Sequence, residues 1–215
     1  MRYGPDHKEQ TRRRIIDAAA ELFREKGPEA TALPEVMAAA GLTVGGFYRH
    51  FESKDELFLA ALERAMGQTL DLLRGKDKES PAQARGAGTG KDSWIARAAA
   101  VYLHPAHRAN VAGGCPLPVL SSEVARRGGP ARRRFEDTLV DIVDEVEPRM
   151  PSGTDLPPRE RSWGFLATLV GGLLLARGVD DDGLADEILT ACRHAVAPEA
   201  RTGDRGAPDH EEDAS

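Results

Sequence analysis

The fold of this 215-residue chain is indicated by the stretch AAAGLTVGGFYRHFESKDEL, residues 38–57. Gly41 permits a tight turn after one helical segment, and Phe47 and Phe51 recur at helical spacing in the next. Ser53 and Glu56 form a capping-box pattern, which predicts that another helix begins there. A helix, a glycine-containing turn and a short second helix together outline a helix-turn-helix motif.

The segments on either side of this stretch carry helical patterns as well. Upstream, apolar residues recur at helical spacing from Thr11 until Gly27, and a second helix is expected to begin at Thr31 as its N-cap. Residues 1–10 are polar and are expected to be frayed. Downstream, helices are expected at 93–103, 116–126, 130–146, 158–177 and 183–196. No segment alternates with period two, so the predicted fold is all-α.

The net charge of −6 and the pI near 5.6 would argue against a nucleic-acid partner if the charge were spread evenly, but the acidic residues are concentrated at one end of the chain. Residues 198–215 carry six acidic and two basic residues, whereas the first 14 carry five basic and two acidic ones. Two cysteines exclude a disulfide framework, and no secretory signal is recognised. The longest uncharged run, 162–176, is shorter than the ~20 residues of a membrane span. A cytoplasmic protein without a membrane partner is expected.

The chain resembles the tetracycline-repressor (TetR) family of transcriptional regulators, which includes AcrR-like proteins. The matching residues are 31–33, 38–43, 45–51 and 53–57, and the resemblance extends back over 15–27, so that it covers about residues 10–66. Residues 114–117 and 170–177 resemble one common type of the family's ligand-binding domains. The resemblance implies a probable repressor, not an enzyme, that binds a palindromic operator in double-stranded DNA as a homodimer and is released by a small apolar effector.

The resemblance also implies a domain organisation: an N-terminal three-helix helix-turn-helix domain and a C-terminal helical bundle for ligand binding and dimerisation. The expected boundaries are 1–55 for the DNA-binding domain, 56–74 for a connecting helix, 75–92 for a flexible loop, 93–197 for the ligand-binding and dimerisation domain, and 198–215 for a disordered acidic tail.

DNA-binding residues follow from the resemblance position by position. Five residues match positions that touch phosphates or the groove edge in the family: Thr31, Thr43, Tyr48, His50 and Lys54. Three residues match positions that face bases: Val44, Gly46 and Arg49. The same recognition helix also contains Gly45 and Phe47. Gly46 departs from the small hydroxyl residue or alanine usual there, and Val44 from a lysine, proline or polar residue. Because glycine lowers helix stability by ~1 kcal/mol relative to alanine, the recognition helix is expected to be mobile in the free protein and ordered on DNA.

Effector and dimer contacts are expected in the C-terminal half. Trp94, Tyr102, Cys115 and Trp163 are candidates to line an effector pocket, although each is also compatible with a place in the core. The segment 158–177 is apolar almost all round, which predicts burial on two sides, the second against its copy in a C2 dimer. The expected interface residues are Leu166, Leu169, Val170, Gly171, Leu173 and Leu174.

No catalytic motif, metal site or cofactor site is recognised. His104 and His107 flank Pro105 and are interpreted as part of a surface loop. Cys115 is either a small buried residue, which is favoured, or a reactive sensor. An alternative class remains open: a small-molecule-binding helical protein or enzyme with a vestigial helix-turn-helix. Activator and repressor are not distinguished by the sequence.

Overall fold

The computed structural model describes residues 5–73, 91–151 and 155–197, and this part of the chain contains helices and no strands. The all-α prediction is therefore confirmed. The elements are α1 (Pro5–Lys26), α2 (Leu33–Ala39), η1 (Val44–Arg49), α3 (Lys54–Leu73), α4 (Lys91–Tyr102), α5 (Pro105–Ala109), α6 (Leu117–Arg127), α7 (Gly129–Val146), η3 (Glu147–Arg149), α8 (Pro158–Arg177) and α9 (Asp182–Val196). The expected loop 75–92 and acidic tail 198–215 lie almost entirely outside the described residues.

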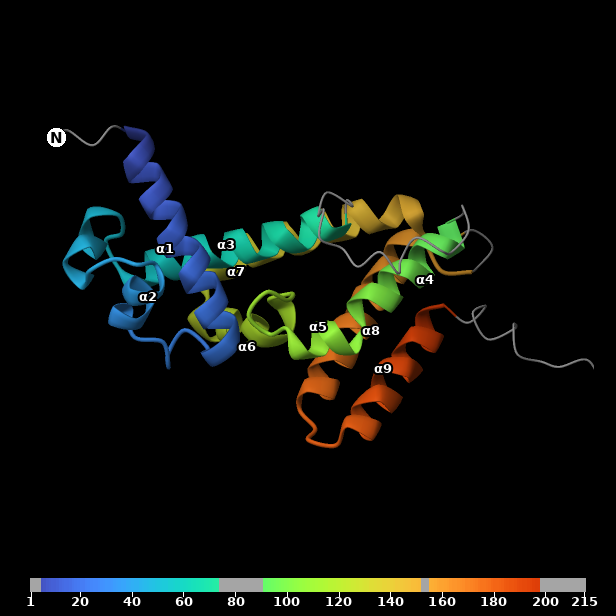
Figure 1. Ribbon diagram of the computed structural model, residues 1–215. Coiled ribbons are helices and arrows are strands. Elements are labelled where there is room, and N and C mark those ends of the chain that lie inside the picture. Colours follow the sequence, from blue (N-terminus) through green and yellow to red (C-terminus); the bar gives the residue numbers. More distant parts are fainter. Residues whose placement is uncertain (1–4, 74–90, 152–154, 198–215) are drawn as a thin grey trace, which may run out of the picture.

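The helix-turn-helix unit lies at one end of the molecule, where α2 and η1 pack beside α1 (Figure 1). Its core contains Ile15, Phe23, Val36, Met37 and Phe47, none of which is exposed. The Phe47 ring stacks on Phe51 with centroids 5.7 Å apart, as the helical spacing predicted. Burial of these rings holds η1 against α2 and fixes which of its residues face solvent.

Gly41 makes the turn between α2 and η1 with a φ of 68°. This left-handed conformation favours glycine, because a Cβ is strained there. A Cβ at this position would also lie 2.9 Å from Nη2 of Arg14. The turn glycine predicted from the sequence is therefore required by backbone conformation and by packing.

The capping box at the start of α3 is confirmed, with one change of partner. The Ser53 hydroxyl accepts a hydrogen bond from the backbone N–H of Glu56 at 3.1 Å. The Glu56 carboxylate accepts from the N–H of Glu52 at 2.7 Å, one residue before the expected partner. From this start α3 extends toward the C-terminal half and packs along α7 (Figure 1).

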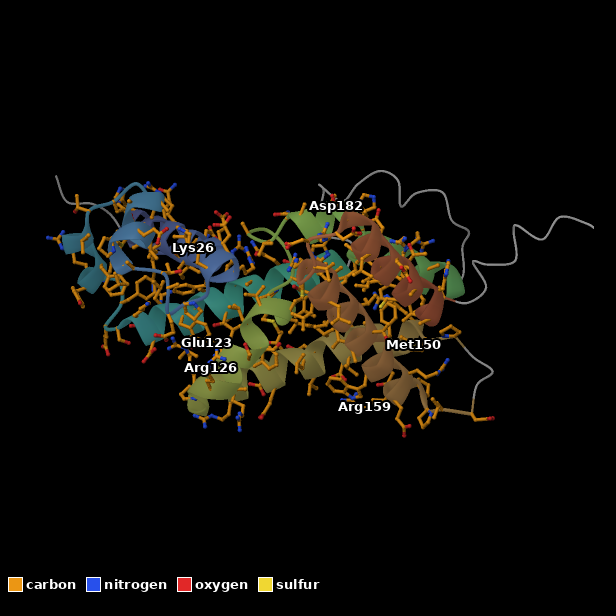
Figure 2. The ribbon with its side chains drawn as sticks, turned by 90° about the horizontal axis from the view of Figure 1, so that it is seen from below. Lys26, Glu123, Arg126, Met150, Arg159 and Asp182 are labelled. Carbon is orange, nitrogen blue, oxygen red and sulfur yellow. The ribbon has the colours of Figure 1, made fainter. Side chains whose placement is uncertain are left out.

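The C-terminal half is a helical bundle in which α8 and α9 form the most extensive helix pair. Figure 1 shows this pair on the side of the molecule away from α2 and η1. Arg159 at the start of α8 binds Asp144 at 2.7 Å and Glu147 at 3.1 Å, which ties α8 to the end of α7. Figure 2 shows Arg159 far from Lys26, the last residue of α1.

Three local predictions are wrong, each for a tertiary or capping reason. Helix α1 begins at Pro5, which suits the first turn of a helix because proline's missing N–H costs nothing there, so residues 5–10 are helical rather than frayed. Thr31 does not cap α2, whose N-cap is Ala32, because the Thr31 hydroxyl donates to the carbonyl of Gly27 at 2.8 Å instead. The expected loop at His104 contains α5, and His104 accepts from the N–H of Ala106 as its N-cap.

Candidate nucleic-acid interface

The expected recognition element, η1, is a short 3-10 helix in which two consecutive glycines follow Val44. Its hydrogen bonds include Gly46 N–H to the Thr43 carbonyl at 3.0 Å and His50 N–H to the Phe47 carbonyl at 2.9 Å. Thr43 occupies the N-cap position, but its side chain accepts no capping hydrogen bond. The element is thus held mainly by the buried Phe47 ring rather than by an extended α-helical ladder.

An exposed row of side chains runs along η1 and into α3. Val44 is 44% exposed and Tyr48 is 72% exposed, so both side chains face solvent. Thr43 and Arg49 are also exposed, and Lys54 is half-buried at the N-terminus of α3. Among the described residues, neither Arg49 nor Lys54 makes a hydrogen bond or ion pair. Both cations are therefore available to an external anion.

Two expected DNA contacts face the interior instead. Thr31 is fully buried, and its hydroxyl is occupied by the Gly27 carbonyl, so it is not placed to touch a phosphate. Phe47 is also fully buried and packs against Phe51 and Tyr48. Both residues support the interface from behind, because the tight turn after α1 and the η1 core draw them inward.

Cations from α1 and η1 lie near His50, the residue that follows η1. Burial lowers the pKa of His50, and the nearby cations Lys8, Arg12 and Arg49 lower it further, so the ring is neutral at pH 7. Its Nδ1 is buried without a hydrogen-bond partner in the described structure. An open hollow of about 500 Å³ adjoins this cluster and is lined by residues 48–53 and Glu56. The contribution of α1 through Lys8 and Arg12 follows from the tertiary structure, since their sequence positions lie far from η1.

The arginines 12–14, in the first half of α1, are engaged within the chain. Arg12 pairs with Glu56 at 3.3 Å and lies over the Phe51 ring, and Arg13 pairs with Glu9. Arg14 donates to the carbonyl of Ala40 in the helix-turn-helix turn. On a helix, a run of three arginines is compatible with a phosphate clamp or with a solvated face. These contacts give it a structural role in positioning α2 and α3 against α1.

The four candidate effector contacts do not form one group. Tyr102 and Cys115 are each 5% exposed and lie together, and burial raises the pKa of the Cys115 thiol, which keeps it protonated. Trp94 is half-buried against Phe165, with ring centroids 6.3 Å apart. Trp163 is 38% exposed, so it lies on the outer surface of α8 rather than inside the bundle.

The expected dimer residues divide between two faces of α8. Leu169 and Leu173 are 2% and 0% exposed, because that face packs in the core of the same chain. Leu166, Val170 and Gly171 are half-buried, and Leu174 is 51% exposed. The neighbouring Leu175 was not among the expected residues but is 61% exposed. Its position one residue after Leu174 in an all-apolar run hid this exposure from sequence reasoning.

The comparisons with known proteins agree with this architecture. The family model "Bacterial regulatory proteins, tetR family" matches residues 15–61, which include the helix-turn-helix. Residues 15–61 therefore match the TetR family. The assignment at the level of family and fold, made from the motif residues, is thereby confirmed.

The named relatives of this chain differ in how much of their length they share with it. The uncharacterized regulator YerO of Bacillus subtilis is 33% identical over 70 residues, a match that covers 33% of this chain and about a quarter (24%) of that relative's length. The transcriptional repressor Rv3405c of Mycobacterium tuberculosis is 29% identical over 199 residues and 90% of each chain. These names are those of regulators, which supports the expectation of a protein that is not an enzyme.

Solved structures of transcriptional regulators share the fold over most of the chain. A regulator from Chloroflexus aurantiacus superimposes with a TM-score of 0.71 at 23% identity, covering 92% of this chain and 97% of that one. The regulator FadR of Bacillus subtilis, solved in complex with stearoyl-CoA, has a TM-score of 0.59 at 16% identity, covering 84% and 96%. At these identities the likeness concerns the fold alone. In the described residues, no helix is both long and apolar enough to cross a membrane.

Proposed function

We propose that this protein is a ligand-responsive transcriptional regulator that binds double-stranded DNA through η1, and that it is a repressor, as its relative Rv3405c is named. The observation that carries the proposal is the exposed row of residues 43, 44, 48 and 49, together with Lys54 at the start of α3. The side chains of Arg49 and Lys54 have no hydrogen-bond or ion-pair partner among the described residues. Arginine is suited to a guanine edge, valine to a thymine methyl, and a lysine at a helix N-terminus to a phosphate. Such a regulator acts in the cytoplasm, where bacterial DNA lies.

The test separates base contacts from phosphate contacts. Arg49→Ala should reduce the preference for operator over random DNA by about tenfold or more, because one bidentate base contact is worth about 1–3 kcal/mol. Lys54→Ala should weaken operator and random DNA about equally, and should reduce the salt slope by about one unit. Fluorescence anisotropy with DNA from the chain's own upstream region, titrated at several salt concentrations, measures both quantities.

Arg133→Met provides a matched control, since Arg133 is an exposed cation on α7, outside the helix-turn-helix unit and the exposed row. It should change neither quantity. If the wild-type protein binds its upstream DNA no better than random DNA at any salt concentration, the proposed function is wrong, and a helix-turn-helix without a DNA partner is favoured.

We also propose a C2 homodimer formed by the outer faces of α8 and α9. The outward residues of α8 form an apolar stripe. This stripe has open space at two glycines, since a Cβ at Gly164 or Gly171 would meet nothing within 4 Å in the same chain. Leu174 and Leu175 continue this stripe, and Leu184 on α9 is 45% exposed. Two recognition elements related by a two-fold axis require a palindromic operator whose half-sites are about 34–36 Å apart.

Release by an effector is the remaining part of the proposal. The structure of FadR with stearoyl-CoA provides an example of small-molecule binding in a protein with this fold. An effector bound in the C-terminal bundle would shift the population toward a state whose two η1 elements are wrongly spaced for the operator. The effector must bind the two states with different affinities, and this difference limits the loss of DNA affinity that it causes.

Gly45→Ala should stabilise η1. The added Cβ would meet nothing within 4 Å, and Gly45 is not in the left-handed region, so alanine restricts the backbone without strain. Up to about 1 kcal/mol of local stability corresponds to roughly fivefold slower exchange of amides 45–48 in the free protein. Hydrogen exchange followed by NMR or mass spectrometry measures this, with operator DNA expected to slow exchange in the wild type.

Gly41→Ala is the contrasting variant, because its φ of 68° and the nearby Arg14 leave no room for a Cβ. It should lower stability. Equal protection of amides 45–48 in wild type with and without operator would show that η1 is already ordered in the free protein.

A further inference from the structure

Tyr102 and Arg177 place two unpaired hydrogen-bond donors inside the C-terminal bundle. The Tyr102 side chain is 5% exposed, and neither its hydroxyl nor Nη1 of Arg177 has a hydrogen-bond partner within the described residues, although the Cys115 thiol lies beside the hydroxyl. Tyr102 and Arg177 also lie within electrostatic range of each other. Burial of an unpaired donor is unfavourable, and more so when the donor is charged. The pair therefore indicates a binding partner that the described chain does not supply.

Backbone carbonyls fix the direction of the Arg177 guanidinium. Its Nε donates to the carbonyl of Arg108 at 3.1 Å, and Nη2 donates to those of His107 at 2.8 Å and Asn110 at 3.3 Å. These carbonyls belong to the end of α5, which packs against α8 (Figure 1). In the described part of the chain, no carboxylate lies within 4 Å of this cation. The charge is held in place but not neutralised, with Nη1 unoccupied.

The groups that contact Tyr102 and Arg177 are neutral; the second cation nearby, Arg24, lies within electrostatic range of Cys115, and its guanidinium already donates to the Ala112 carbonyl and to Gln68. His107 uses both ring nitrogens: Nδ1 lies 2.6 Å from the Tyr102 carbonyl, and Nε2 accepts from the Cys115 N–H at 3.1 Å. Burial lowers the pKa of His107 and raises that of Cys115, so both are neutral at pH 7. The Thr69 hydroxyl lies beside the thiol. The cluster thus presents one positive charge and hydrogen-bond donors in a buried setting.

We propose that Arg177 Nη1 and the Tyr102 hydroxyl bind a carboxylate group of the effector, which is therefore an organic acid. This inference rests on the proposed ligand-responsive function and specifies its ligand class. A carboxylate matches one cation with two donors, because each oxygen can accept a charge-assisted hydrogen bond. A phosphate dianion would leave charge and acceptor oxygens uncompensated in this setting. The Tyr102–Arg177 pair, rather than the tryptophans, is then the polar end of the effector site.

The first measurement compares acids with neutral analogues on the full chain. Straight-chain monocarboxylates from acetate to decanoate are titrated by calorimetry beside the primary amides of equal length. At least one carboxylate should bind about tenfold or more tightly than its amide and raise Tm, because only the acid pairs with Arg177. Equal or absent binding of every acid and amide would overturn the proposal and leave internal water as the partner of these donors.

Variants test the two donors separately. Tyr102→Phe should weaken carboxylate binding about tenfold while leaving the Tm of the free protein equal or higher, because it removes a buried unpaired hydroxyl. Arg177→Met should abolish the preference for acid over amide, whereas Arg133→Met, on the exposed surface of α7, should preserve it. A fall in Tm for Tyr102→Phe without any change in carboxylate binding would indicate a structural hydroxyl and overturn the assignment.

The proposed effector class and the proposed regulatory function can be disproved independently of each other. Sequence-specific DNA binding by the free protein, without any preference for carboxylates, overturns the effector class alone. A preference for carboxylates that depends on Arg177 and Tyr102, without sequence-specific DNA binding, supports the site and overturns the regulatory function.

Discussion

Replacement of Leu175 by Glu is expected to convert the proposed dimer to a monomer and to weaken operator binding by more than about a hundredfold. Leu175 is 61% exposed on the outer face of α8, beside Leu174 at 51%, so the substitution leaves the chain's own core intact. In a dimer the same position would bury a carboxylate against apolar surface, without a partner. Loss of the second half-site contact removes an avidity factor of about 10²–10⁴.

Analytical ultracentrifugation measures the change of mass, and a gel shift with the palindromic operator measures the loss of affinity. Val140→Glu provides the control, because Val140 is 41% exposed on α7 rather than on α8 or α9. It should remain dimeric and bind the operator normally. A Leu175→Glu protein that stays dimeric with unchanged operator affinity would place the dimer interface elsewhere.

Replacement of Arg127 by Met is expected to lower the free energy of unfolding by about 2 kcal/mol and to weaken the response of DNA binding to the effector. Arg127 ends α6, where its side chain is 18% exposed. It binds Glu123 at 2.6 Å, Glu29 at 2.6 Å and Asp55, and its guanidinium lies over the Phe58 ring. Glu29 follows α1 and Asp55 lies in the first turn of α3, so this one side chain joins the C-terminal half of the chain to its N-terminal helices.

The loss of stability expected for Arg127→Met arises because Glu123 is buried, with a side chain 6% exposed. Burial alone would raise its pKa, but hydrogen bonds from Arg126 and Arg127 outweigh burial and hold the pKa below its usual value. Without Arg127, the carboxylate retains a single partner. Figure 2 shows Glu123 and Arg126 close together on α6.

Arg126→Met is the matched control. Arg126 binds the same carboxylate, but its side chain is 67% exposed and it makes no contact with Glu29 or Asp55 in the described structure. Its loss should cost less than about 1 kcal/mol and leave the effector response intact. Urea unfolding and operator titrations with and without effector measure both properties. Equal effects of the two substitutions would mean that Arg127 has no special role in coupling the domains.

The helix-turn-helix unit was predictable because its signals are local. Gly41 has the positive φ that the turn pattern implied, Ser53 and Glu56 cap α3, and Phe47 and Phe51 pack as their spacing indicated. The exposure of Val44, Tyr48 and Arg49 follows from the same pattern, since residues on the face opposite Phe47 must point outward. The N-cap prediction for Thr31 is wrong because its hydroxyl is turned toward the carbonyl of Gly27, to which it donates, and accepts no hydrogen bond from the first turn of α2.

Burial in the C-terminal half was less predictable. Apolar residues surround α8, so periodicity could not separate Leu173, which is fully buried, from Leu174 and Leu175 beside it. The sequence likewise could not distinguish whether Trp163 or Tyr102 lies in the interior, and only Tyr102 is buried. A helix without a polar face gives no period from which to assign its inner side.

The sequence by itself determined the fold class and the residues displayed by η1, because turns, caps and helical spacing depend on neighbours along the chain. Only the tertiary structure decided which charges meet. Arg127 joins Glu29 and Asp55 across separations of 98 and 72 residues, and Arg177 reaches the carbonyls of α5 from 67 to 70 residues away. Long side chains select partners by direction and burial, which are fixed when the helices pack.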